Sequence, residues 1–441
     1  MRSLAVCLNE TRIGTLRETD DLWNFEYEVS WQESPNGFDL SPALPRSTRL
    51  YQDGASVRPI QWYFDNLLPE EKLREAVSRE AGIRGDDAFA LLEYLGRESA
   101  GSLILAPPDI PATKEGGGLQ PLTDEMLSQR IQNMPRVPLS STAPKRMSAA
   151  GTQNKLLVVY RDGALYEPTG SEPSTHILKP DNTSADYPAT AINEYMIMKL
   201  AAELHLQVPQ VYRRYVPEPV YIVERFDRYQ DAGTTHRTHI IDACQLLNKS
   251  RLFKYTAATL DTMAEIIERC TNKARTRIAL FQWLAYNILI GNNDNHLKNL
   301  SFRVDHEGIA LCPFYDLLST VVYHTRLFAQ ERADWPEVPL TISLPACSAY
   351  NELNREALLA AGEKLGLPPR ISERELTRIS RALLAAMDEL VRAIRTDSAG
   401  LPEGSNRFLA GETRLLDAIR HIVTAEMLSK ISSMMSIGFQ G

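Results

Sequence analysis

Cysteine is scarce in this 441-residue chain, and its five cysteines include no C-x-x-C pair. That usage is typical of a reducing compartment and argues against a zinc site ligated by cysteine. Long apolar runs are also missing. No stretch of about eighteen apolar residues could form a membrane helix, and the first residues do not have the pattern of a signal peptide. These absences predict a cytoplasmic protein that does not enter a membrane.

An excess of positive charge is absent as well. The formal net charge is −8 and the sequence pI is near 5.6. A surface of this kind binds the phosphate backbone of nucleic acid poorly, since that binding depends on Lys and Arg. Any contact with DNA would therefore need a local basic patch or a partner protein. Internal repeats and long blocks of like charge are not found either.

The chain has ample material for two or three hydrophobic cores, with 44% hydrophobic residues. Alternating apolar residues predict strands in its first half, whereas amphipathic helices predominate later, for example over 188–206, 272–290, 373–395 and 412–435. A turn-rich break lies at 107–121. We expect three parts: a β-rich N-terminal subdomain (1–107), a second β-rich part (108–229) and an all-helical C-terminal lobe (230–441).

The stretch from Gly291 to Asp316 contains the clearest chemical pattern. Asp294 and Asn299 have the D-x-x-x-x-N spacing of a protein-kinase catalytic loop, where the Asp accepts a proton from the attacking hydroxyl and the Asn holds magnesium. Asp316 follows a predicted hairpin, where such enzymes keep their main metal-binding carboxylate. Magnesium prefers hard oxygen ligands of this kind. By itself, however, the spacing also fits a polar loop that caps a helix and has no chemistry.

Other parts of a kinase site occur in the required order. A small-residue loop, 150–155, could cover nucleotide phosphates, and Lys179 ends a predicted strand, where kinases keep their phosphate-pairing lysine. Glu194, on the next helix, is a candidate ion-pair partner of Lys179. The extended segment 224–226 could bind adenine through backbone groups. This order predicts an α+β, kinase-like two-lobed fold that uses ATP and Mg²⁺.

Several longer strings then resemble one family. They are FDNLLPE (64–70), GRESAG (96–101), RMSAAGTQNK (146–155), HILKP (176–180), NEY (193–195), VERFDR (223–228), DACQ (242–245), GNNDNHLKN (291–299) and PFYD (313–316). Together they resemble the HipA family of toxin kinases. The resemblance implies a bacterial serine/threonine kinase that is the toxin of a type II toxin–antitoxin pair. It also implies a HipB-like DNA-binding antitoxin, contact with operator DNA mainly through that antitoxin, and a protein substrate such as glutamyl-tRNA synthetase, whose phosphorylation would block translation and cause growth arrest and persistence.

The resemblance also implies roles for individual residues. Asp294 matches the catalytic base, Asn299 and Asp316 the magnesium ligands, and Ser148 the serine that such kinases autophosphorylate to switch themselves off. Glu194 remains the candidate ion-pair residue. The predicted phosphate-loop and nucleotide-binding residues are Ala150, Gly151, Thr152, Gln153, Asn154, Lys155, Lys179, Glu224, Arg225, Phe226, His296, Lys298, Asn299, Tyr315 and Asp316.

Two departures and two alternatives stay open. Asn295 stands where Gly is frequent in the family, and 151–154 reads Gly-Thr-Gln-Asn rather than the commoner Gly-Ala-Gln-Glu, which concerns loop dynamics and rate. One alternative is a catalytically weak, kinase-fold corepressor that acts on operator DNA with its antitoxin. Another is a glycosidase that uses Asp294 and Asp316 as paired carboxylates, although the sequence alone does not give the distance between the two acids.

Overall fold

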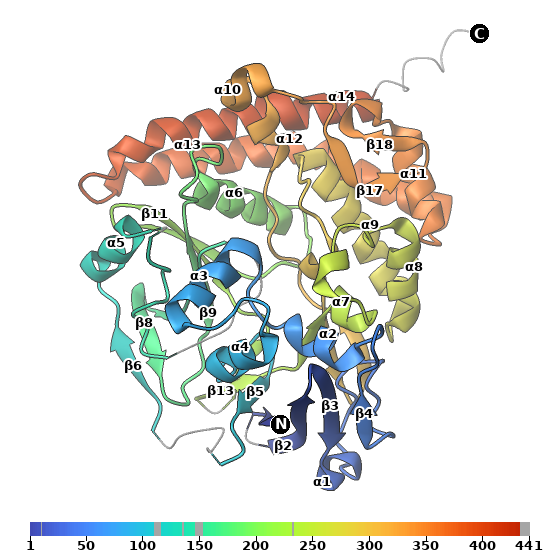
Figure 1. Ribbon diagram of the computed structural model, residues 1–441. Coiled ribbons are helices and arrows are strands. Elements are labelled where there is room, and N and C mark those ends of the chain that lie inside the picture. Colours follow the sequence, from blue (N-terminus) through green and yellow to red (C-terminus); the bar gives the residue numbers. More distant parts are fainter. Residues whose placement is uncertain (10, 110–115, 135, 146–152, 232, 433–441) are drawn as a thin grey trace. The chain divides into compact units, whose positions relative to one another are not determined.

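The computed structural model describes residues 1–9, 11–109, 116–134, 136–145, 153–231 and 233–432 (Figure 1). The chain divides into two compact units, each made of three segments. Unit 1 comprises Met1–Lys179, Ile222–Lys254 and Leu300–Cys312, and unit 2 comprises Pro180–Tyr221, Tyr255–Asn299 and Pro313–Gly441. The predicted domain boundaries at 107 and 229 stay predictions.

Unit 1 begins with an antiparallel sheet of order β4-β3-β2-β1-β5. Its strands are β1 (Arg2–Leu8), β2 (Thr11–Thr19), β3 (Leu22–Tyr27), β4 (Leu50–Gln52) and β5 (Leu103–Ala106). The helices nearby in sequence are α1 (Val29–Gln32), α2 (Pro59–Asp65), α3 (Glu71–Ala81) and α4 (Ala88–Leu95). Strict alternation in β3 buries Trp23, Phe25 and Tyr27, and Trp23 packs edge-on against Phe89 of α4 at 5.2 Å.

A second sheet of unit 1 supports the predicted nucleotide residues. Strand β7 (Leu156–Arg161) pairs with β8 (Ala164–Thr169) and with β9 (His176–Pro180), and β6 (Gly118–Pro121) pairs with β8. The strand order continues from β9 to β11 (Pro219–Glu224), and the boundary between the units falls within β11. Helix α5 (Asp124–Gln132) is capped at its start by Thr123, whose side chain accepts the Met126 N–H.

The remaining elements of unit 1 are short. They are the hairpin β12 (Arg228–Asp231) and β13 (Thr234–Arg237), the sheet β14 (Ile240–Asp242), β15 (Ser301–Asp305) and β16 (Gly308–Leu311), and helix α7 (Ala243–Leu246). The hairpin predicted after the Asp294 loop is confirmed as β15 and β16.

Unit 2 is mainly helical. Its helices are α6 (Thr190–Glu203), α8 (Leu260–Arg269), α9 (Lys273–Ile290), α10 (Arg326–Ala329), α11 (Arg355–Lys364), α12 (Pro369–Asp397), α13 (Asn406–Ala418) and α14 (Ala425–Ser432); its strands are β10 (Val211–Tyr215), β17 (Pro339–Leu344) and β18 (Cys347–Ala349). Helix α9 is mostly buried from Leu280 to its end at Ile290 and packs against α12. It also contacts α6, since the Tyr286 hydroxyl donates to the Ile197 carbonyl at 2.6 Å.

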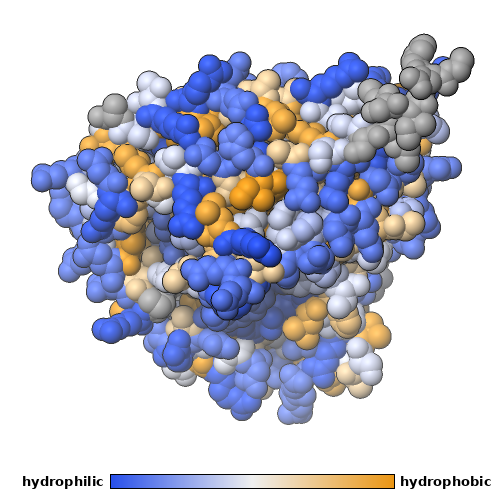
Figure 2. All heavy atoms as spheres, turned by 90° about the horizontal axis from the view of Figure 1, so that it is seen from above, coloured by the Kyte–Doolittle hydropathy of each residue, from blue (hydrophilic) through white to orange (hydrophobic). Residues whose placement is uncertain are grey.

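Long helix α12 is amphipathic. It buries Leu376, Ile379, Leu383 and Met387 at helical spacing and leaves its other face polar. Figure 2 looks from above onto the side where α12 and α14 appear at the top of Figure 1, and there hydrophilic residues surround smaller hydrophobic groups. Within the part of the chain that the structure describes, none of the helices combines the length and apolar character needed to cross a membrane.

Two expectations for the C-terminal lobe were wrong in detail. The lobe is not all helical, because β17 and β18 form a hairpin and β13 to β16 also lie beyond residue 230. The helix predicted over 412–435 begins earlier, at Asn406, and a π-helical turn (Ile419–Thr424) divides it into α13 and α14. The sequence did not predict this division, because the spacing of apolar residues in a helix does not show where one turn changes from i→i+4 to i→i+5 hydrogen bonds.

Candidate active site

Helix α9 delivers the chain to the predicted catalytic loop and ends at Gly291. This glycine has left-handed backbone angles, φ 70° and ψ 46°, and a Cβ there would collide with side-chain atoms of Val321 and Val423. Its carbonyl accepts hydrogen bonds from the N–H groups of Thr320 and Val321, at 2.9 and 3.0 Å. The start of the loop is therefore fixed against the segment that follows Asp316.

The loop holds its own shape through asparagine side chains. Asn292 accepts the Asp294 N–H at 3.0 Å and donates to Asn287 of α9 at 2.7 Å. The carbonyl oxygen of Asp294 accepts from the His296 N–H at 3.0 Å and from the Asn299 side-chain amide at 2.7 Å. Side chains of Asn and Asp stabilise turns in this way. The five-residue spacing is thus one closed turn that joins Asp294 to Asn299.

The Asp294 carboxylate stays accessible, with its side chain 40% exposed. The hydroxyl of Tyr255 donates to its Oδ1 at 2.5 Å, and the Tyr255 ring packs edge-on against His296 with centroids 4.8 Å apart. Tyr255 is itself 43% exposed. A general base must lie within hydrogen-bonding reach of the proton that it removes. Asp294 meets this condition for a hydroxyl group.

Asn299 and Asp316 are the two predicted magnesium ligands, and both lie in unit 2. The amide nitrogen of Asn299 donates to the Asp294 carbonyl oxygen, so its amide oxygen is the atom of this side chain that would bind a metal. Asp316 adopts a left-handed conformation, φ 57°, and the neighbouring Tyr315 hydroxyl donates to the Lys298 carbonyl at 2.6 Å, which ties this segment to the loop. Among the described residues no group of three or more His, Cys, Asp or Glu could hold a metal. Two oxygen ligands completed by phosphate and water oxygens suit magnesium.

Helix α6 supports the same part of unit 2. The side chain of Asn193 donates to the Ser319 carbonyl and accepts the Ser319 N–H, both at 2.8 Å. Its neighbour Glu194 is buried. The pKa of Tyr221 lies well above its usual range because the phenol is buried, and the nearby carboxylates of Glu194 and Asp316 raise it further. The predicted ion pair between Glu194 and Lys179 stays a prediction.

In unit 1, Lys179 is buried near the end of β9, next to β7 in the sheet. Residues 153–155 are half-buried and lead directly into β7. A cavity of about 40 Å³ beside Lys155, lined also by Leu73, Tyr94 and Lys145, is too small for a nucleotide. The predicted residues Ser148, Ala150, Gly151 and Thr152 lie outside the described residues.

The side chains of the predicted adenine linker (224–226) differ in their exposure to solvent. Glu224 is exposed and Phe226 is half-buried, but the Arg225 guanidinium points into unit 1, where it contacts Asp227, Ser174 and the Ser99 carbonyl. Its backbone N–H donates to the Thr175 carbonyl at 2.9 Å. Arg225 therefore serves first to anchor the linker.

Three residues with clear roles in this geometry were missed by reasoning from residue types and spacing: Tyr255, Asn193 and Glu98. Tyr255 lies 39 residues before Asp294 and belongs to no spaced motif. Asn193 and Glu98 occur within the strings NEY and GRESAG, so the resemblance pointed at them without assigning a role. The roles of these three residues become clear only from the tertiary contacts that their side chains make.

Comparisons with known proteins agree with this geometry. The family model described as the HipA-like C-terminal domain matches residues 147–390, and the HipA N-terminal domain matches residues 4–106. The serine/threonine-protein kinase toxin HipA of Shewanella oneidensis is 30% identical over 414 residues, 88% of this chain and 89% of the relative. The protein Y4mE of Sinorhizobium fredii is 36% identical over 311 residues, 68% of this chain and 72% of the relative.

A solved structure is similar as well. A chain from the Shewanella oneidensis complex of HipA, HipB and operator DNA superposes with a TM-score of 0.77 at 27% identity, covering 98% of this chain and 97% of that one. Both family domains, the relative of nearly equal length and the shared architecture agree with the expectation from the sequence strings. This chain belongs to the HipA family and has its kinase-like α+β fold.

Proposed function

We propose that this protein is an ATP-dependent serine/threonine protein kinase that acts as the toxin of a toxin–antitoxin pair. The observation that carries the proposal is the Asp294 carboxylate, which is half-exposed, fixed by its own loop and already hydrogen-bonded to a hydroxyl group, that of Tyr255. Membership of the HipA family and similarity to a serine/threonine-protein kinase toxin support the same function.

In the proposed reaction, the Asp294 carboxylate accepts the proton of a serine or threonine hydroxyl. The hydroxyl oxygen then forms a bond to the γ-phosphorus of ATP, the bond to the bridging oxygen breaks, and ADP leaves. Asn299 and Asp316 would hold Mg²⁺, which neutralises charge on the phosphate oxygens. Lys179 and residues 150–155 would contact the phosphates, with His296, Lys298 and Tyr315 near the nucleotide and Glu224 and Phe226 at the adenine.

The finer assignments rest on family resemblance. A HipB-like antitoxin would be the partner, since the similar solved structure contains HipA, HipB and operator DNA. This chain would then reach operator DNA mainly through the antitoxin, which fits its net charge of −8. Glutamyl-tRNA synthetase is the proposed substrate class, with translation block, growth arrest and persistence as the result. Autophosphorylation of Ser148 would end the activity.

The test is phosphate transfer from radiolabelled ATP to a cell lysate, comparing wild type with Asp294→Asn. The variant should lose transfer by at least about 100-fold, because a base is removed, while ATP binding is nearly kept, because little volume changes. Asp261→Asn, on an exposed position of α8, is the control. Transfer by Asp294→Asn at the wild-type rate would refute the assignment. An inactive wild type that still binds its antitoxin on DNA would favour the corepressor alternative.

A further inference from the structure

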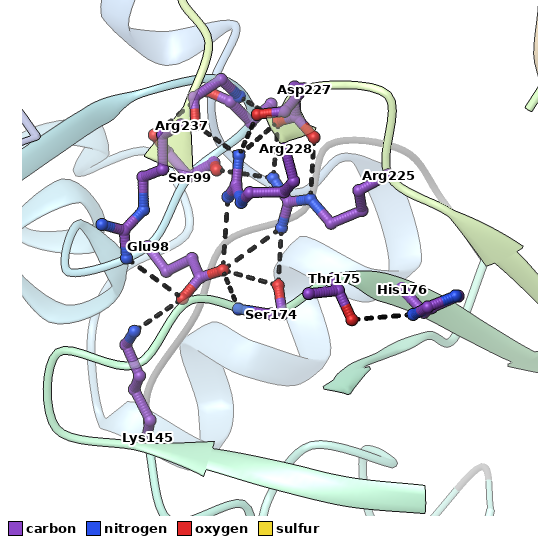
Figure 3. A network of polar contacts seen from close by, with 12 residues as sticks. Glu98, Ser99, Lys145, Ser174, Thr175, His176, Arg225, Asp227, Arg228 and Arg237 are labelled. Carbon is purple, nitrogen blue, oxygen red and sulfur yellow. Dashed lines mark hydrogen bonds and ion pairs between the residues drawn. The ribbon is translucent and has the colours of Figure 1, made fainter. Parts of the chain in front are cut away.

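One carboxylate in unit 1 is the centre of a buried network of charges. Glu98, which follows α4, is fully buried, and its two oxygens contact groups from four separate chain segments (Figure 3). The contacts are Lys145 Nζ at 2.6 Å, the Ser174 N–H at 3.0 Å and hydroxyl at 2.5 Å, Arg228 Nη2 at 3.3 Å, Arg225 Nη1 at 3.4 Å and Arg237 Nη2 at 3.7 Å.

The network has four cationic side chains and two carboxylates. Asp227 is the second carboxylate and contacts Arg225 at 2.7 Å and Arg228 at 2.9 Å. Burial alone would raise the pKa of Glu98, but Lys145 and the three arginines outweigh it and hold the pKa well below its usual range. Glu98 is therefore ionised, and without its charge Lys145 and Arg237 would lose their main counter-ion, whereas Arg225 and Arg228 would keep Asp227.

The segments that Glu98 contacts lie next to the predicted nucleotide-binding elements or within them. Lys145 is the last described residue before 146–152, the segment that carries Ser148 and the first half of the predicted phosphate loop (150–155). Ser174 lies two residues before β9 (His176–Pro180), the strand that contains Lys179. Arg225 lies within the predicted adenine linker, and its N–H also donates to the Thr175 carbonyl. Glu98 itself comes from the part of the chain that matches the HipA N-terminal domain.

We propose that Glu98 is a positioning residue for nucleotide binding, which fixes the chain before the phosphate loop, the start of the lysine strand and the adenine linker relative to one another through Lys145, Ser174 and Arg225. This inference rests on the proposed kinase function, since it assigns a nucleotide to those elements. The N-terminal part of the chain would then help to position the nucleotide-binding residues. Misplacing a binding group by about 1 Å can cost a large factor in binding or rate.

Unit 1 offers a matched control. Glu167 of β8 is also buried and pairs with Arg130 of α5 through two bonds of 2.7 and 2.8 Å, but neither residue touches the three elements. Glu98→Gln and Glu167→Gln thus make the same chemical change at buried ion pairs. If Glu98 only stabilised the fold, the two substitutions should have similar effects on ATP binding.

The experiment measures the Kd of Mg-ATP at a temperature where both variants remain folded, together with hydrogen exchange of unit 1. Glu98→Gln should weaken ATP binding about tenfold or more and speed exchange in 139–145, 153–161 and 222–228. Glu167→Gln should leave the Kd within about twofold of wild type, whatever its loss in Tm. ATP affinity equal to wild type in Glu98→Gln, or faster exchange spread evenly over unit 1, would overturn the proposal.

A second pair of variants covers the case in which Glu98→Gln does not fold. Lys145→Met leaves Glu98 with its three arginines and Ser174, and so removes only the contact at the start of the loop. It should also raise the Kd of Mg-ATP, whereas Lys145→Arg should restore it; unchanged affinity in Lys145→Met would contradict the inference. If wild type itself fails to bind ATP, the proposed function fails, and the exchange data still decide whether Glu98 fixes these segments.

Discussion

At the scale of single residues, Asp294 is positioned by contacts that its own sequence neighbourhood provides. Asn292, His296 and Asn299 all lie within five residues of it and close the loop around its backbone. That is why the D-x-x-x-x-N spacing could be interpreted from the sequence. The hydroxyl on its side chain comes from Tyr255, a remote residue with no spacing rule, and only the fold brings it to Asp294.

A first prediction concerns the metal. Asp316→Asn should remove most of the gain in ATP affinity that Mg²⁺ provides, because a carboxylate ligand and its charge are lost. Asn is chosen because it tolerates the positive φ of this position. Titration calorimetry with and without Mg²⁺ measures the effect, and Asp334→Asn, an exposed carboxylate of unit 2 paired with His324, is the control. An equal magnesium effect in Asp316→Asn and wild type would remove Asp316 from the proposed site.

A second residue-scale prediction concerns pH and His239. This imidazole is fully buried in unit 1, where it contacts the Ser102 hydroxyl, the Leu40 carbonyl and the Tyr63 hydroxyl, and burial lowers its pKa to about 4. Its unfolded pKa is about 6.5, so the unfolded chain binds the proton more tightly. The stability that neutral His239 contributes is therefore present above pH 6.5 and is lost as the pH falls toward 4.

The size follows from the shift, about 3 kcal/mol over that window. We expect the difference in unfolding free energy between wild type and His239→Gln to shrink by about this amount from pH 7 to pH 4. Urea unfolding at a series of pH values measures it, and His306→Gln, in the exposed turn between β15 and β16, controls for the substitution itself. A difference that does not vary with pH would show that His239 takes up its proton equally in both states.

At the scale of elements, helix ends position the site. Helix α9 must stop at Gly291, since both its left-handed conformation and the close approach of Val321 and Val423 exclude a side chain. The sequence predicted this helix and its end well because an apolar run followed by Gly is a local signal. It did not predict the π-helical turn or the β17–β18 hairpin, which depend on tertiary packing rather than on periodicity.

The two glycine caps of α9 and α3 give a matched prediction. Gly82 ends α3 with φ 66° and has open space where a Cβ would lie, whereas the same position at Gly291 is blocked. Gly82→Ala should cost about 1 kcal/mol from the backbone alone. Gly291→Ala should cost roughly 2–4 kcal/mol, because overpacking adds to the backbone term, and it should slow phosphate transfer. Chemical denaturation of the two variants compares them, and equal losses would mean that the Val321 and Val423 contacts relax at little cost.

At the scale of the whole molecule, the family resemblance predicted more than local patterns could. Residue order and matching strings between residues 64 and 316 led to the α+β kinase-like fold, which is confirmed. Local patterns could not predict the network at Glu98, whose members lie as far apart as residues 98 and 237. Contacts over such separations produce no periodic pattern in the sequence, because each segment supplies only one or two charged side chains.

A further prediction concerns the effect of the whole protein on bacterial growth. Expression in a bacterial host should arrest growth, and co-expression of a HipB-like antitoxin should relieve the arrest, because the proposed kinase would phosphorylate a protein needed for translation. Asp294→Asn at matched soluble levels is the control and should allow growth. Colony counts and culture density measure both effects. Normal growth with abundant soluble wild-type protein that lacks phosphate on Ser148 would count against a toxin.

The interleaving of the two units has a consequence for synthesis on the ribosome. Unit 1 begins at Met1 but needs residues 300–312 to complete its β14–β15–β16 sheet. At roughly 5–20 residues per second, the interval between the emergence of Lys179 and of Cys312 lasts on the order of ten seconds. Until residue 294 emerges, late in that interval, the nascent chain contains Glu98, Lys145 and Lys179 but not Asp294 or Asn299. A partly made chain that lacks these two residues is thus inactive in the proposed reaction.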